Sequence, residues 1–245
     1  PAPVPAPVPA PVPAPVPAPA PYPGAYCLGD PHIKTFDGLY YDCQGSGDFV
    51  LLDSAGPAVH GRFTTFLGQS VSRLTGIAVE EDGVSIEVVN DLADRTILVN
   101  GDVYDSLGLF DVSGVSLDIT SVRIEMIFPS GLEVIYFQMF MNDQVFTGGA
   151  FFLLPETIPT VGLLGNNNGD SSDDWQTPSG SVLAPSWGVS SLLPGYIYCV
   201  GNWALGSDTL FSTIFRRHLQ EEDYEPPEIP NPLPDEVAEV GRRHV

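Results

Sequence analysis

The chain has 245 residues, which is enough for one domain of ordinary size with additional segments. It carries 9 Lys and Arg against 31 Asp and Glu, so its formal net charge is -22 at pH 7. Nucleic acids and anionic membrane surfaces bind basic proteins, so this charge argues against both as partners. The sequence also contains no apolar run of about 18 residues, and we therefore expect no membrane span in this chain.

Residues 1–24 form a low-complexity segment, PAPVPAPVPAPVPAPVPAPAPYPG, with proline at nearly every second position. Proline fixes its own φ angle and pushes the preceding residue toward extended geometry. The segment is therefore predicted to form a polyproline II stalk that rises about 3.1 Å per residue and is roughly 70 Å long if straight. Two interpretations remain open: a plain spacer, or a modified stalk like the hydroxyproline-rich, O-glycosylated tracts of algal and plant extracellular matrix proteins.

The central part of the chain is predicted to be an all-β domain of short antiparallel strands. Along residues 122–126 apolar and polar side chains alternate, which is typical of a strand with one solvated face. Three turn motifs separate neighbouring strands: Glu81-Asp82-Gly83, Asn100-Gly101 and Pro129-Ser130-Gly131. Many short strands with turns about every 8 to 12 residues indicate a sandwich-like fold. The predicted strand regions are 48–53, 59–66, 74–89 as two strands, 95–104 as two strands, 115–120, 122–128, 132–139 and 144–154.

The strongest local feature is GNNNGDSSDDW, residues 165–175, in which six Asn and Asp side chains fall within nine residues. Counted from Asn166, the residues at positions 3, 5, 7 and 9 also carry side-chain oxygens, and an EF-hand loop spaces its calcium ligands in this way. Hard oxygen ligands select Ca2+ over transition metals. The alternative is a solvated turn rich in Asn, Asp and Gly. The six side chains are those of Asn166, Asn167, Asn168, Asp170, Asp173 and Asp174.

Residues 212–245 are predicted to be a flexible, acidic and proline-rich tail or linker. The segment contains too few apolar side chains to offset the entropy lost on ordering. One short helix over 210–222 is the only helix that we predict.

A second motif, GDPHIKTFDGLYYDCQGSGDFVLL, spans residues 29–52. It resembles the opening of a von Willebrand factor type D domain, in which G-D-P-H, T-F-D-G, Y-D and Q-G precede an aromatic strand. The Asn/Asp loop resembles the closing signature of the same family, and CVGNWALGSDTLF, residues 199–211, resembles the segment that ends the domain. The resemblance covers residues 27–211 and implies an antiparallel, sandwich-like β domain over that range.

The resemblance also implies one structural calcium ion. Asp37 of the T-F-D-G turn would connect the start of the domain to its end through this ion. Closing so long a loop with a metal ion stabilises a fold. The implied ligands are Asp37, Asn166, Asn168, Asp173 and Asp174, with Asp170 as a weaker candidate.

The chain has three cysteines, so at most one internal disulfide can form. We predict that Cys43 pairs with Cys199 and joins the first and last strands. Cys27 would then be a free thiol or an intermolecular link. Leu164 and Gly47 stand where many animal members of the family have cysteines, so the chain resembles the cysteine-poor bacterial and algal versions.

The Gly29-Asp30-Pro31-His32 motif has a further possible meaning. In some members of the family the Asp30–Pro31 bond would correspond to one that cleaves itself. Asp30 would attack its own carbonyl and His32 would assist the proton transfer. No Ser/His/Asp arrangement is legible, and we expect that the chain is not an enzyme acting on an external substrate.

These features favour an extracellular or cell-surface structural or adhesive module stabilised by calcium. Such a module would contribute to a matrix or filament by self-association or by contact with an extracellular protein or glycan. The alternative is an ectodomain that recognises one specific protein or glycan partner.

Overall fold

The computed structural model of the chain describes residues 24–65, 71–91, 94–141, 144–183 and 192–212. The predicted stalk over 1–24 and the predicted tail over 212–245 lie almost entirely outside the described residues. Within the described ranges, no helix has both the length and the apolar character needed to span a membrane.

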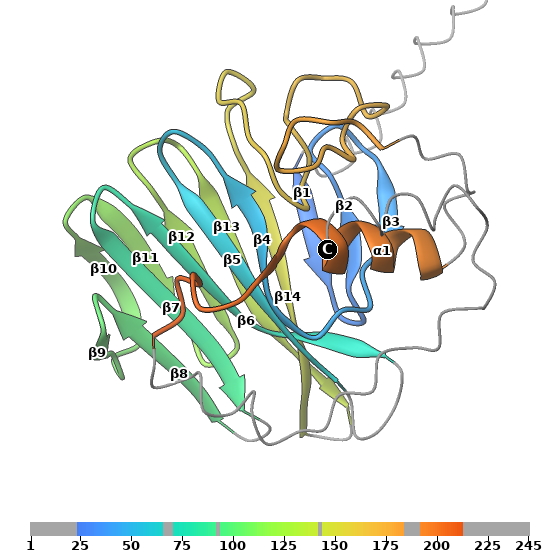
Figure 1. The fold of residues 1–245 in the computed structure, drawn as a ribbon. Helices are drawn as coiled ribbons and strands as arrows, with labels where there is room; N and C mark the ends of the chain where they lie inside the picture. The colour runs from blue at the N-terminus through green and yellow to red at the C-terminus, as the bar shows by residue number, and fades with distance from the viewer. Residues whose placement is uncertain (1–23, 66–70, 92–93, 142–143, 184–191, 213–245) are drawn as a thin grey trace, which may run out of the picture.

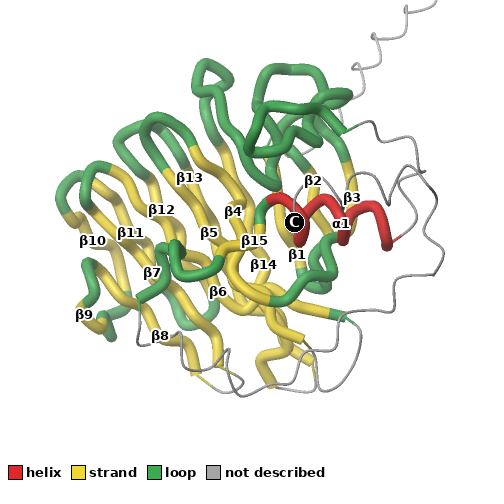
Figure 2. Tube along the Cα trace, in the orientation of Figure 1, coloured by secondary structure: helices red, strands yellow, loops and turns green. Residues whose placement is uncertain are grey.

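Two antiparallel sheets pack face to face as a β-sandwich, which confirms the predicted all-β fold (Figures 1 and 2). Sheet A has the strand order β10-β11-β12-β13-β14-β1-β2-β3, and sheet B has the order β15-β4-β5-β6-β7-β8-β9. Sheet A consists of β1 (Ala25–Leu28), β2 (His32–Lys34), β3 (Tyr40–Asp42), β10 (Gly108–Val112), β11 (Val115–Ile119), β12 (Arg123–Ile127), β13 (Glu133–Met141) and β14 (Gln144–Leu153). Sheet B consists of β4 (Gly47–Asp53), β5 (Ala58–Thr65), β6 (Ser72–Glu81), β7 (Val84–Asp91), β8 (Asp94–Val99), β9 (Asp102–Val103) and β15 (Ala204–Leu205).

Two hairpins of sheet B form at the predicted turn residues. Asp82 and Gly83, between β6 and β7, have φ angles of 51° and 79°. Asn100 and Gly101, between β8 and β9, have φ angles of 52° and 85°. Positive φ at both central positions gives a turn whose twist matches that of the flanking strands. These turns therefore set the register of the adjacent strands in sheet B.

The inner faces of the two sheets form one apolar core that includes a buried polar contact. Tyr136 of β13 and Phe152 of β14 face this core from sheet A, and Phe49 and Ile77 face it from sheet B. The Asn90 side-chain amide of β7 donates a hydrogen bond of 2.7 Å to the Tyr136 hydroxyl. A buried hydroxyl with a fixed partner favours one alignment of the two sheets.

Residues 204–212, here called the C-terminal strap, cross the outer face of sheet B (Figure 1). The strap begins as β15, which pairs with β4. The Leu210 amide donates to Nδ1 of His60 on β5 at 2.9 Å, and the Ser212 amide donates to Glu87 on β7 at 2.8 Å. Phe211 is fully buried in a second apolar cluster with Ala78, Val89 and Leu98. The strap therefore covers the face of sheet B that points away from the main core.

The helix α1 (Leu192–Asn202) precedes the strap and differs from the helix that we predicted over 210–222. Residues 210–212 are not helical, and the rest of that prediction lies outside the described residues. Pro194-Gly195 resembles a turn in the sequence, yet proline is tolerated in the first turn of a helix. A Cβ built on Gly195 would overlap the carbonyl of Asp42, so glycine allows α1 to approach β3 closely.

Candidate metal site

The candidate site lies where the turn between β2 and β3 meets the loop of residues 155–183. The Asp37 carboxylate accepts hydrogen bonds from the backbone amides of Asn168 at 3.0 Å and Gly169 at 2.9 Å. Asp37 and the Asn/Asp loop are more than 130 positions apart in the chain. The structure thus brings together the two motifs that carried the resemblance.

Asp174 is buried at the centre of this junction, with 1% of its surface exposed. Its carboxylate accepts hydrogen bonds from the Thr35 hydroxyl at 2.6 Å and from the Asn166 amide at 3.2 Å. Burial raises the pKa of Asp174 to about 6, and the neighbouring Asp37 carboxylate also raises it, against the effect of these two hydrogen bonds. Two carboxylates held close together, one buried and one half-buried, attract a cation.

Asn166 presents an oxygen with no hydrogen-bond partner. Its side-chain nitrogen donates to Asp173 at 2.8 Å. Its Oδ1 atom is buried and accepts no hydrogen bond in the structure. An unsatisfied buried amide oxygen costs free energy, so its presence calls for an explanation such as a bound ion.

Asp173 and Asp170 have different environments within the loop. Asp173 accepts hydrogen bonds from the side-chain amides of both Asn166 and Asn168. Asp170 accepts hydrogen bonds from the Ser172 amide and hydroxyl, which lower the pKa of its carboxyl group. Asp170 is exposed and closes its own turn, whereas Asp173 contacts the residues that surround Asp174.

The donor set fits a hard cation such as Ca2+. The described residues contain no group of three or more His, Cys, Asp or Glu that could hold a metal ion. The acidic part of the site is instead the pair Asp37 and Asp174, and amide oxygens must supply further ligands. An ion there would offset the repulsion between the two carboxylates and give Asn166 Oδ1 a partner.

Two residues that position this site were not identified from the sequence. Thr35 is fully buried and donates to Asp174, and its only sequence signal is its place two residues before Asp37. Gly165 has a φ angle of 84°, and a Cβ at this position would overlap the Asp174 carboxylate. Asn167, one of the six loop side chains, donates instead to the carbonyls of Pro155 and Ile158 and so braces the loop.

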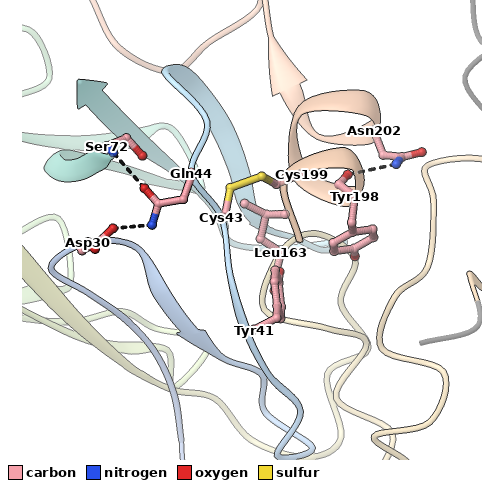
Figure 3. Close-up of a disulfide and its surroundings, with 9 residues drawn as sticks. All are labelled: Asp30, Tyr41, Cys43, Gln44, Ser72, Leu163, Tyr198, Cys199 and Asn202. Carbon is pink, nitrogen blue, oxygen red and sulfur yellow. Dashed lines mark hydrogen bonds between the residues drawn. A yellow bond between two sulfur atoms is a disulfide. The ribbon is translucent and has the colours of Figure 1, made fainter. Parts of the chain in front are cut away.

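A disulfide joins Cys43 to Cys199, the residue that follows Tyr198 in α1 (Figure 3). Its Cα atoms are 6.0 Å apart, and 156 positions separate the two cysteines in the chain. The pairing is the predicted one, but Cys199 lies in α1, so the bond connects the end of β3 to a helix rather than to the last strand. Cys27 is a free thiol buried in β1, and burial raises its pKa.

Aromatic rings connect the disulfide to the metal-site loop. Tyr198 of α1 stacks on Trp175 with ring centroids 5.2 Å apart, and the Tyr198 hydroxyl lies 3.2 Å from the carbonyl oxygen of Asp174. Tyr41 donates from its hydroxyl to the Leu163 carbonyl. Large aromatic side chains whose hydroxyls form hydrogen bonds make a rigid support. Packing against α1 therefore stabilises the conformation of the loop.

The residues around the Asp30–Pro31 bond are engaged in other contacts. The Gln44 side-chain amide donates to the Asp30 carboxylate and accepts a hydrogen bond of 2.9 Å from the Ser72 amide (Figure 3). His32 pairs with Asp42 at 2.6 Å. Gln44 therefore holds the carboxylate that would have to attack, and self-cleavage stays an untested alternative that we do not favour.

Comparison with known proteins supports the resemblance over most of the described domain. The pattern of the von Willebrand factor type D domain family matches residues 26–181. Human Sushi domain-containing protein 2 is 32% identical over 199 residues, which is 74% of this chain and 23% of that protein. Human Mucin-4 is 28% identical over 66% of this chain and 3% of its own length, and hemocytin of Bombyx mori is 28% identical over 68% and 5%.

These relatives correct one part of the sequence interpretation. All three are animal proteins, so the expected likeness to cysteine-poor bacterial and algal versions is not supported. The matched region covers less than a quarter of each of these relatives.

Proposed function

Because the chain belongs to the von Willebrand factor type D domain family, we propose that it is a structural or adhesive module whose fold is stabilised by a bound calcium ion. The chain is extracellular, in keeping with the mucin among its relatives. A disulfide is also typical of proteins that fold in an oxidising compartment.

The observation that carries the calcium proposal is the junction between Asp37 and the Asn/Asp loop. Asp37 and Asp174 would hold the ion with Asn166 Oδ1, and Asn168 and Asp173 would complete or orient the donor set. The ion would neutralise the two carboxylates and connect the β2–β3 turn to the far end of the domain. Its role would be to stabilise the fold, and no chemical step is assigned to it.

The role in a matrix or adhesive surface rests on the family and remains a proposal for this chain. The relatives are much longer than the matched region, so their other domains can carry activities that this chain lacks.

We also propose that the chain is not an enzyme. The Asp30 carboxylate is bound by Gln44, so a single intact mass of the purified protein is the expected result and a split at Asp30–Pro31 would contradict it.

Thermal or urea unfolding with and without calcium tests the metal site. A ligand that binds only the folded state at about one hundred times its Kd stabilises it by about 2.7 kcal/mol. Asp174→Asn should abolish this increment, because it removes one of the two carboxylates. In the presence of a chelator the same variant removes the repulsion with Asp37 but keeps only one of the two acceptor oxygens, so the calcium increment and not the absolute stability is the measure.

Asp170→Asn is the matched control, since Asp170 is exposed and bonded to Ser172. This variant should keep most of the calcium increment. A second set of unfolding measurements uses NaCl at the ionic strength of the calcium solution. Screening of the net charge of -22 depends on ionic strength alone, so NaCl reproduces screening but not specific calcium binding. An increment that NaCl reproduces, or that survives Asp174→Asn, would contradict the proposed site.

A further inference from the structure

A row of aromatic side chains crosses the outer face of sheet A. It consists of Phe137 on β13, Phe151 on β14, Tyr26 on β1 and Tyr40 on β3, and we call it the aromatic row. Phe137 and Phe151 are stacked with centroids 5.5 Å apart, Phe151 and Tyr26 meet edge to face at 6.0 Å, and Tyr26 and Tyr40 follow at 6.3 Å. Each ring thus contacts the next, and the four rings form a continuous surface.

Strand register explains why these rings share one face. Phe151 pairs with Tyr26, Tyr26 pairs with Lys34 of β2, and Lys34 pairs with Tyr40. The neighbours of these residues along each strand, such as Cys27, Phe152 and Tyr41, point the other way and are buried in the core. The rings of the row therefore face away from the sandwich, and 55% of Tyr40 is exposed.

The two outer faces of the sandwich differ. On sheet B the C-terminal strap fills the outer face with Phe211, whose burial is complete. On sheet A the aromatic row is half-buried at Tyr26, Phe137 and Phe151 and exposed at Tyr40. Half-buried aromatic rings with polar tips are typical of surfaces that bind a partner.

The chemistry of the row suits an extended, proline-rich chain. Such a chain has carbonyl acceptors at every residue but lacks an N–H donor at each proline, so it needs donors from its partner. The Tyr26 and Tyr40 hydroxyls can supply them, and burial together with the neighbouring Tyr40 raises the pKa of Tyr26, which keeps its proton. Aromatic-lined surfaces bind polyproline II segments in this way in other proteins.

This chain carries a segment of that kind immediately before β1, the strand of Tyr26, in the sequence. Residues 1–23 alternate proline with alanine or valine, except for Tyr22, have no charged side chain, and join β1 through Gly24. The protein has a net charge of -22, so an uncharged segment can approach it without the repulsion that a second acidic surface would meet. The row spans five adjacent strands, about 19 Å, which matches about six residues of polyproline II.

The stiffness expected of the proline-rich segment favours a segment from another copy. Lys34 donates to the Gly24 carbonyl at 3.2 Å, so Gly24, the residue before β1, is held beside β2. The aromatic row runs across the strands, roughly at a right angle to β1. A stiff segment with Pro21 and Pro23 just before Gly24 is poorly suited to reverse and lie on its own row.

We propose that the aromatic row of one copy binds the proline-rich segment, residues 1–23, of a second copy. The contact joins different surfaces of the two molecules, so it propagates head to tail instead of closing into a symmetric dimer. The repeats within the segment offer several equivalent binding positions, which raises the effective affinity. The inference deepens the proposed structural role and rests on it for its biological meaning.

Sedimentation of the full chain over a wide concentration range tests this inference. We expect reversible association that a synthetic peptide of residues 1–23 inhibits, whereas the same peptide with every proline replaced by alanine does not. Tyr40→Ser should weaken association about tenfold, since one aromatic contact is lost. Leu109→Ser is the matched control, because Leu109 is 75% exposed on β10 of the same sheet and lies outside the row.

Folding and the calcium response are measured on the same samples. Tyr40 is largely exposed, so Tyr40→Ser should unfold at the temperature of the parent and keep the parent's calcium increment. Loss of association alone then supports the aromatic row, and loss of the calcium increment alone bears on the proposed metal site. A chain that is monomeric at every concentration, association unaffected by Tyr40→Ser and the peptide, or Tyr40-dependent binding of an oligosaccharide in its place would overturn the proposal.

Discussion

Gly165 and Gly169 have nearly the same backbone conformation but different surroundings. Their φ angles are 84° and 87°, in the region where a side chain is strained. A Cβ on Gly165 would overlap the Asp174 carboxylate, whereas a Cβ on Gly169 would meet nothing within 4 Å. The two glycines therefore separate the cost of the backbone conformation from the cost of disturbing the site.

Gly165→Ala should cost more stability than Gly169→Ala and should also remove the response to calcium. Both variants pay about 1 to 2 kcal/mol for placing alanine at positive φ. Only the first displaces Asp174 from Thr35 and Asn166. Urea unfolding of both variants, with and without calcium, measures the difference. Equal losses in the two variants would mean that Gly165 is required only for its backbone conformation.

The C-terminal strap depends on a set of buried charged and polar groups on sheet B. Arg62 and Asp48 form an ion pair at 2.7 Å with 3% of each side chain exposed, and the Arg62 guanidinium lies 4.1 Å from the Phe211 ring centre. His60 accepts the Leu210 amide through Nδ1, so that nitrogen carries no proton in the folded state. Protonation of His60 would remove this hydrogen bond.

The strap should therefore loosen as the pH falls. Burial lowers the pKa of His60 in the folded state, although Asp48 and Asp53 oppose this effect. Because the unfolded chain then binds the proton more readily, stability is lost as the pH falls through about 6.5, the unperturbed pKa of histidine. Losing the Leu210 hydrogen bond would account for about 1 kcal/mol of this effect.

His60→Asn tests the effect, because an amide oxygen can still accept the Leu210 amide but does not titrate in this range. The free energy of unfolding is measured between about pH 5 and 8 for both proteins. Asp174 titrates in the same range in both, so the difference between the two curves isolates His60. Parallel curves would show that His60 does not control the strap.

Elements whose signals are local in the sequence were predictable. The hairpins at Asp82-Gly83 and Asn100-Gly101 follow from turn residues that tolerate positive φ. The alternation along β12 correctly identified a strand with one buried face. The strands β1, β2 and β3 have three or four residues each, too few for a periodic pattern to be recognised.

Elements fixed by distant contacts were not predictable from the sequence. The strap is held by a hydrogen bond between Leu210 and His60 across 150 positions, and the first turn of α1 contains a proline and a glycine that resemble a turn in the sequence. The candidate metal site likewise combines features that are visible in the sequence with contacts that are not. The Asn/Asp loop is visible in the sequence, whereas the buried Asn166 oxygen and the Thr35 contact exist only once the chain has folded.

At the scale of the whole molecule, two connections join the start of the domain to its end. The disulfide connects Cys43 to Cys199, and the proposed calcium site connects Asp37 to the loop that ends at Asp174. The disulfide and the proposed calcium ion act on different states of the chain, the unfolded and the folded state. A disulfide restricts the unfolded chain, whereas an ion that needs the assembled site binds only the folded one.

Reduction of the disulfide should therefore lower stability without changing the calcium increment. A closed loop of 156 residues corresponds to about 5 kcal/mol in the chain-entropy model. Urea unfolding is measured with and without reductant, at zero and saturating calcium, in Cys27→Ala to exclude disulfide exchange. Additive effects are expected because the states acted on are separate. A calcium increment that disappears on reduction would mean instead that the disulfide, through Tyr198 and Trp175, is needed to build the metal site.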